Sequence, residues 1–143
     1  MIAITARKPD PRFALTIDLP LPPSANALFA NAAKGRVRTK EYNAWLNEAR
    51  WHVITAWRAA GKPVAPDKVP MLLWIRVGLT ARNRDISNCS KAVEDVLVKE
   101  LPIPDDRWND RILIERSPNP EFEGICRVTI AVLDPPLSVE PKP

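Results

Sequence analysis

Proline is the feature that most constrains this chain, because 16 of its 143 residues are proline and only four are glycine. Proline fixes φ and removes a backbone donor, so it is excluded from central strands and from the interior of helices. Regular elements must therefore lie between the proline-rich segments at residues 8–11, 20–23 and 134–143. We expect a flexible N-terminal segment at residues 1–12, one folded domain at residues 13–133, and a disordered tail after it.

The segments between the prolines carry strand and helix patterns in turn. Strands are predicted at residues 13–19, 69–80, 111–116 and 125–133, and a loop at residues 24–29. Apolar residues repeat at helical spacing between Thr39, a predicted N-cap, and Gly61. The same pattern occurs at residues 88–100, so two helices are predicted. This order predicts an α/β (α+β) fold, with a single mixed sheet of about four strands and two helices packed on it. The apolar faces of these elements are expected in the core and comprise Phe13, Leu15, Ile17, Leu19, Tyr42, Trp45, Leu46, Ala49, Val53, Ala56, Trp57, Ala60, Leu73, Ile75, Val77, Leu79, Cys89, Ala92, Val93, Val96 and Leu97.

Charge and hydropathy narrow the functional class. Lysine plus arginine total 21 against 17 acidic residues, a net charge of +4, which is compatible with a nucleic-acid partner. No apolar run reaches the roughly 18 residues that a membrane helix needs, since the longest stops at Arg76. The first residues hold no apolar core of a secretory signal, so we expect a cytoplasmic protein without a membrane partner.

The chain has few histidines and cysteines, which argues against several kinds of catalytic and metal site. His52 is the only histidine, and Cys89 and Cys126 form no CxxC pair, so a zinc site or a histidine-dependent nucleophile is not expected. We interpret all three as packing residues. Catalysis by the carboxylates of aspartate and glutamate is the class of chemistry that these counts leave.

The densest polar cluster is residues 82–91, which join the second long strand to the second helix. Asp105 and Asp106 follow that helix after two prolines. One interpretation is a metal site built from carboxylates at one edge of the sheet. The other is that these residues are ordinary helix caps and turn residues, and spacing alone does not decide between the two.

Two segments of the chain resemble the RusA family of Holliday-junction resolvases. Residues 19–26 read LPLPPSAN, similar to the family's LPxPPSxN opening, and residues 84–91 read RDISNCSK, followed by Asp95, Leu97 and the Asp105–Asp106 pair. The resemblance implies a Mg²⁺-dependent endonuclease, with Mn²⁺ as a possible substitute. Its substrate would be branched DNA, a four-way junction that a homodimer nicks during recombination and repair. It also suggests a phage or prophage origin.

The resemblance assigns roles to individual residues. Asp85 matches the first acidic metal ligand, Asp106 the late catalytic aspartate, Asp105 the acid beside it, and Lys91 the catalytic lysine. Ser87 occupies the family's second acidic position, where it offers a hydroxyl to the metal but no charge. Two further positions match an asparagine and a helix aspartate of the family, Asn88 and Asp95.

The serine keeps other functions open. A catalytically weak protein that binds branched DNA, or a less selective flap and branch nuclease of phage origin, remains an alternative. Glu94 is close in sequence, but its expected angle on the helix does not suit it to replace the missing acid.

A basic run lies between the two motif segments. Lys34, Arg36, Arg38 and Lys40 alternate, so in an extended segment all four point to one side and form a rail for a phosphate backbone. A solvated loop is the alternative. The other arginines expected around the carboxylates are Arg82, Arg84, Arg107 and Arg111.

Trp51 points away from the apolar stripe of the first helix. An exposed tryptophan indicates a partner surface, unless another element covers it. Trp51 and Arg58 are therefore candidates for a homodimer interface.

Overall fold

The computed structural model describes residues 8–33, 35–79 and 86–133. Its main sheet has four strands in the order β1-β6-β4-β5. The strands are β1 (Ala14–Pro20), β4 (Met71–Gly78), β5 (Asn109–Ser117) and β6 (Ile125–Val132). β4 and β5 are parallel and the other neighbours antiparallel, so the predicted mixed sheet is confirmed.

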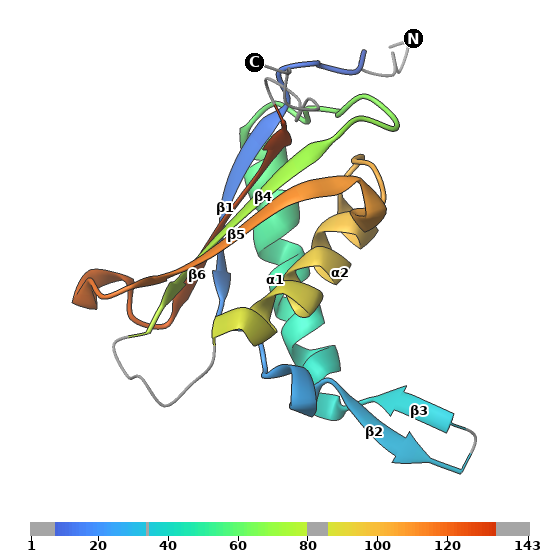
Figure 1. Ribbon diagram of the computed structural model, residues 1–143, viewed down its shortest axis with the longest axis vertical. Coiled ribbons are helices and arrows are strands. Elements are labelled where there is room, and N and C mark those ends of the chain that lie inside the picture. Colours follow the sequence, from blue (N-terminus) through green and yellow to red (C-terminus); the bar gives the residue numbers. More distant parts are fainter. Residues whose placement is uncertain (1–7, 34, 80–85, 134–143) are drawn as a thin grey trace, which may run out of the picture.

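Two helices, α1 (Lys40–Ala59) and α2 (Ser90–Glu100), cover one face of this sheet (Figure 1). The core lies between the helices and that face, because alternate residues of β1, β4 and β6 point toward it. The core side chains named from the sequence are buried except at the end of the first helix, where Ala56 and Trp57 are half-buried and Ala60 is exposed. Cys89 and Cys126 are buried as expected, whereas His52 is exposed, so its assignment as a packing residue was wrong.

Local hydrogen bonds explain where α1 begins and how the first motif segment is held. The Thr39 hydroxyl accepts from the Tyr42 amide at 3.1 Å and donates to the Ala27 carbonyl at 2.6 Å, which confirms Thr39 as the N-cap. The Trp45 indole donates to the Pro20 carbonyl at 3.0 Å. The proline-rich motif segment is therefore tied to the first two turns of α1.

The region before α1 differs from the prediction. Residues 24–29, expected to be a loop, contain the short 3₁₀ helix η1 (Ala25–Ala27) and the start of a hairpin, β2 (Phe29–Ala32) and β3 (Gly35–Arg38). This hairpin projects from the body of the protein (Figure 1). Its strands pair only with each other, and apolar residues do not alternate strongly enough along them to reveal the pairing in the sequence.

Short 3₁₀ helices also occur beside the second motif segment. η2 (Ile86–Cys89) precedes α2, so the regular α-helix begins at Ser90, later than expected. η3 (Asp106–Trp108) leads into β5, and η4 (Pro120–Phe122) lies between β5 and β6. Cys89 makes no side-chain cap hydrogen bond, which accounts for a start that cap residues did not reveal.

The face of the sheet away from the helices carries a polar network. Arg127 forms two hydrogen bonds with the Asp18 carboxylate, at 2.7 and 3.0 Å, and Thr16 and Thr129 hydroxyls lie 2.9 Å apart. Within the part of the chain that the structure describes, no helix is long and apolar enough to cross a membrane. Residues 1–7 and 134–143, and with them the expected tail and most of the expected N-terminal segment, lie outside the described residues.

Candidate functional site

A groove of about 480 Å³ lies between α2, η3 and the base of the hairpin. α2 contributes Lys91, Glu94 and Asp95, and the turn before β5 contributes Asp105 and Asp106. Its remaining lining residues are Phe29, Arg38, Val98 and Lys99. The structure therefore brings the second motif's lysine and helix aspartate together with the late aspartate pair, as the carboxylate interpretation requires.

Lys91 and Asp95 form an ion pair one helical turn apart, with 3.2 Å between Nζ and Oδ1. The other oxygen of Asp95 accepts from the Tyr42 hydroxyl of α1 at 2.5 Å. Burial, followed by the hydrogen bond to Asp95, raises the pKa of Tyr42, so the phenol remains a donor. Asp95 is thus held from both sides, by a buried phenol and by a lysine that reaches into the groove.

Asp105 and Asp106 are oriented by the 3₁₀ turn that follows Pro102 and Pro104. The Asp105 carboxylate caps η3 by accepting from the Arg107 amide at 3.1 Å. The two aspartates also hydrogen-bond to each other, which lowers the pKa of Asp105 and raises that of Asp106. The Arg107 guanidinium lies 3.7 Å from the Asp105 carboxylate, so Arg107 lies beside the acids as predicted.

Glu94 also contacts this pair. Partial burial, the charge of Asp106 and a hydrogen bond with it raise the pKa of Glu94 to about 7. Glu94 therefore lies beside the late aspartates, although its expected angle on the helix gave no indication of this contact. The bend of the chain through η3 carries Asp106 back beside the middle of α2, and helical angle alone could not reveal this.

Several predicted site residues lie outside the described residues. These are Asp85, Arg82, Arg84 and Lys34, so the approach of Asp85 to Asp106 stays a prediction. Ser87 and Asn88 belong to η2, but their side chains are also outside the description. Arg111 pairs with Leu72 on the sheet face away from the helices and does not line the groove.

The acidic side chains of the groove are of the kind that binds a hard cation, but among the described residues too few are arranged around one point to hold it. Glu94, Asp105 and Asp106 offer the carboxylate oxygens that Mg²⁺ prefers. Among the described residues, however, no three histidine, cysteine or acidic side chains are arranged to hold a metal ion. A metal at Asp106 would therefore be held by fewer than three of the described acidic side chains, and water or residues outside the described ranges would complete its coordination.

The basic run forms β3 and the start of α1. Arg38 is the register partner of Phe29, and Arg36 is the partner of Asn31, so both arginines lie on one face of the hairpin. The Arg36 guanidinium lies 5.2 Å from the centre of the Phe29 ring, and Arg38 lies 5.8 Å from that of Tyr42. Lys40 is already the first residue of α1. The extended part of the rail is thus shorter than expected, but it leads directly to the carboxylates.

Two residues of the site were not anticipated from the sequence. The sequence predicts Tyr42 only as a buried residue of the first helix, and Phe29 only as part of a loop. Phe29 packs edge-on against Tyr42, with ring centres 5.8 Å apart, and so joins the hairpin to the Asp95 contact. No local pattern could have paired them, because each contact joins distant segments.

Comparison with protein families matches residues 20–132 to the model described as Endodeoxyribonuclease RusA. A comparison with curated proteins found no match. The family match spans both motif segments, the hairpin, both helices and the late aspartates, and so covers most of the chain. The chain therefore belongs to the RusA endodeoxyribonuclease family.

Proposed function

We propose that this protein is a Mg²⁺-dependent, structure-specific endodeoxyribonuclease that resolves Holliday junctions by paired nicks. The observation that carries the proposal is the groove in which Asp105, Asp106 and Glu94 lie beside Lys91. A cluster of carboxylates next to a cation is the arrangement that metal-assisted phosphodiester hydrolysis needs. DNA is the substrate class that membership of the family supports.

Asp106 and Asp85 would hold the metal, with Ser87 and Asp105 beside them. Mg²⁺, or Mn²⁺ in its place, supplies Lewis-acid stabilisation of the phosphate and an activated water when bound. Glu94, which already hydrogen-bonds to Asp106, would control how much negative charge Asp106 presents. Cleavage would leave 5′-phosphate and 3′-hydroxyl ends.

Lys91 would stabilise the charge that develops on the phosphate oxygens. Asp95 acts as a positioning residue, because its contact with Lys91 limits where the ammonium can lie, and Tyr42 holds Asp95 in turn. The competing role for Lys91 is an exposed ion pair, worth less than about 1 kcal/mol.

Arg36, Arg38 and Lys40 would guide the DNA backbone toward the groove, joined by Lys34, Arg82, Arg84 and Arg107. Two copies of the chain would act together as a homodimer, since a four-way junction has two equivalent strands to cut. The biological setting we infer is recombination and repair, in the cytoplasm of a bacterium that carries the gene on its chromosome or on a phage.

A second candidate is a protein that binds branched DNA and cuts it weakly. Ser87 favours this function, because a hydroxyl replaces a charged ligand at that position. A less selective flap or branch nuclease is a third.

A cleavage assay on a synthetic four-way junction, with and without Mg²⁺, tests the proposal. Asp106→Asn should abolish cutting but keep junction binding, because it removes charge from the metal site and not from the basic hairpin. Asp67→Asn, at an exposed position outside the groove, is the matched control and should cut like the parent. Binding without cutting by the parent would favour the second candidate, and cutting by Asp106→Asn at the parent rate would refute the role of Asp106.

A further inference from the structure

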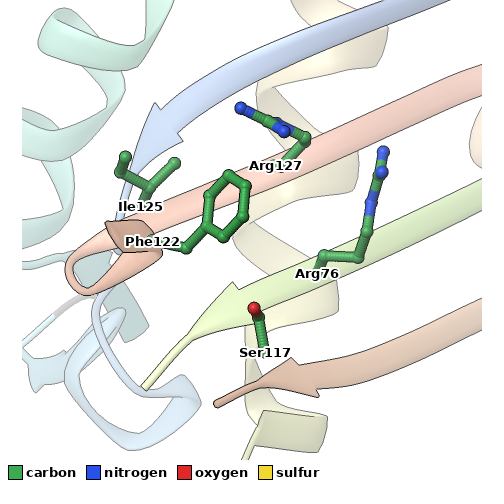
Figure 2. A pocket seen from close by; sticks show the side chains of 5 residues that line it. All are labelled: Arg76, Ser117, Phe122, Ile125 and Arg127. Atoms are coloured by element: carbon green, nitrogen blue, oxygen red, sulfur yellow. The ribbon is translucent and has the colours of Figure 1, made fainter. Parts of the chain in front are cut away.

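A second cavity, of about 110 Å³, lies on the face of the sheet away from the helices. It is lined by Arg76 of β4, Arg127 and Ile125 of β6, Ser117 of β5 and Phe122 of η4. Figure 2 shows the two arginines rising from neighbouring strands, with Phe122 and Ser117 beside them. None of these residues belongs to either family motif or to the carboxylate groove.

The two arginines are direct register partners on antiparallel strands. Like charges in directly opposite positions of a sheet destabilise it. Asp18 relieves the repulsion only in part, because both oxygens of its carboxylate are bound to Arg127. Glu115, the register partner of Arg76 on the other side, instead accepts from the Trp74 indole at 2.6 Å.

Arg76 is left with an unmet hydrogen-bonding capacity. One terminal nitrogen donates to the Thr129 hydroxyl at 2.7 Å, and the guanidinium lies 3.9 Å from the centre of the Trp74 ring. Its Nε is buried and has no hydrogen-bond partner among the described residues. None of the ion pairs found there includes Arg76. A buried donor without a partner is rare and calls for an explanation, and a bound oxyanion or water would supply the missing acceptor.

The walls of the cavity are held in place before any ligand binds. Arg127 lies 4.5 Å from the centre of the Phe122 ring and is fixed by Asp18. η4 packs closely on the end of β4, because a Cβ at Gly78 would come within 1.7 Å of the Phe122 carbonyl oxygen. Two oriented guanidinium groups lose little side-chain entropy when they bind an oxyanion.

We propose that Arg76 and Arg127, with the Ser117 hydroxyl, bind a backbone phosphate of the DNA substrate on the open face of the sheet. The geometry suits a phosphate because guanidinium groups bind its oxygens through paired, charge-assisted hydrogen bonds. This inference rests on the proposed function for the identity of the ligand.

The chain limits the distance between the end of β4, beside the cavity, and η2, which leads into the helix of the groove. Gly78 ends β4 beside the cavity, and Ile86 begins η2 eight residues later, so the two are at most about 28 Å apart. Phosphates on one strand of a duplex advance about 3.4 Å each along its axis, so an arm of about eight base pairs covers this distance. A contact here would hold an arm of the junction and leave the scissile phosphate free for the carboxylates.

The test is a DNA-binding titration at several salt concentrations in EDTA, so that binding is measured apart from cleavage. Arg76→Gln should weaken binding to the four-way junction roughly tenfold and lower the slope of log affinity against log salt by about one. It should not lower the melting temperature of the free protein, because it removes the repulsion with Arg127 and the unpaired donor. Arg12→Gln, an exposed arginine before β1, is the matched control and should change neither affinity nor slope.

Arg76→Lys provides an independent measurement, also if Arg76→Gln fails to fold. It keeps the charge but loses the planar Nε donor, so affinity should fall while the salt slope stays close to that of the parent. Parent-like affinity in both variants, or in Arg76→Lys alone if the other does not fold, would overturn the inference. So would stabilisation of the parent by inorganic phosphate without any effect of Arg76→Gln on DNA binding. A parent that binds DNA with these signatures but does not cut would instead overturn the nuclease and leave the phosphate site standing.

Discussion

At the scale of single residues, the acids of the groove differ in how they hold protons. The hydrogen bond between Asp105 and Asp106 lowers the pKa of Asp105 and raises that of Asp106, whereas burial, followed by the charge of Asp106, raises the pKa of Glu94. The three acids are therefore crowded together. Such crowding costs stability when every group is ionised, and a bound cation would relieve it. Repulsion among these acids therefore lowers the free energy of unfolding of the protein when no cation is bound.

The substitution Glu94→Gln tests this loss of stability. The pKa of Glu94 is raised from 4.5 to about 7 in the folded state, so the folded protein binds this proton more tightly than the unfolded chain does. Stability is then lost as the pH rises from about 4.5 to about 7. The glutamine variant has no such loss, so in EDTA it should be more stable than the parent by about 1 kcal/mol at pH 8, after allowance for solvent screening, with a smaller difference at pH 5.

Urea unfolding at the two pH values measures this difference. Glu48→Gln, at an exposed position on α1, serves as the control and should change the pH dependence little. A Glu94→Gln variant whose gain in stability over the parent is the same at pH 5 and pH 8 would contradict the raised pKa of Glu94.

Tyr42→Phe tests the contact that holds Asp95. The phenol is fully buried and donates to Asp95, so its removal should lower the free energy of unfolding by about 1–3 kcal/mol. Turnover should also fall at saturating DNA, because Lys91 is then less well positioned. A double-mutant cycle with Asp95→Asn checks the assignment, and a coupling energy near zero would show that the two side chains act independently.

At the scale of elements, the β2–β3 hairpin is the part of the structure best placed to lead DNA to the groove. It projects from the body, and its base contributes Phe29 and Arg38 to the groove (Figure 1). The arginines alternate with Val37, so charge gathers on the face that packs toward Tyr42. A solvated loop would show no such ordering.

Changing Arg36 and Arg38 together to alanine should weaken binding to all branched DNA. Each lost phosphate contact releases one fewer counterion, so the salt slope should fall by roughly two per chain. The double variant Lys8→Ala and Arg12→Ala carries the same loss of charge away from the hairpin, and its slope should match the parent. Equal slopes for the hairpin variant and the parent would exclude the rail.

At the scale of the whole molecule, the two helices cover only one face of the sheet, and α1 presents a large aromatic side chain outward. Trp51 is 63% exposed, which confirms that it points away from the core, and no described element covers it. Arg50 lies 5.6 Å from the centre of its ring, and Arg58 is exposed two turns later. Exposed tryptophans beside arginines are typical of interfaces that bind a partner.

Trp51→Glu should therefore convert the proposed homodimer into a monomer. Sedimentation velocity over a range of concentrations measures this, with a parent species of twice the mass of one chain expected. Asn43→Glu introduces the same charge at another exposed position of α1 and should leave the dimer intact. A dimer that persists in Trp51→Glu would assign the interface to another surface.

The sequence by itself determined the order of the main elements, the inward side of each strand, the N-cap at Thr39 and the family motifs. These are local properties, since side-chain alternation, helical spacing and proline positions act within a few residues. Only the tertiary structure decided which distant residues meet. Tyr42 reaches Asp95 across two helices, Asp106 turns back to Glu94 through η3, and Arg76 faces Arg127 because β4 and β6 pair in one particular register. Register and helix packing depend on how the whole core is filled, so no local pattern contains them.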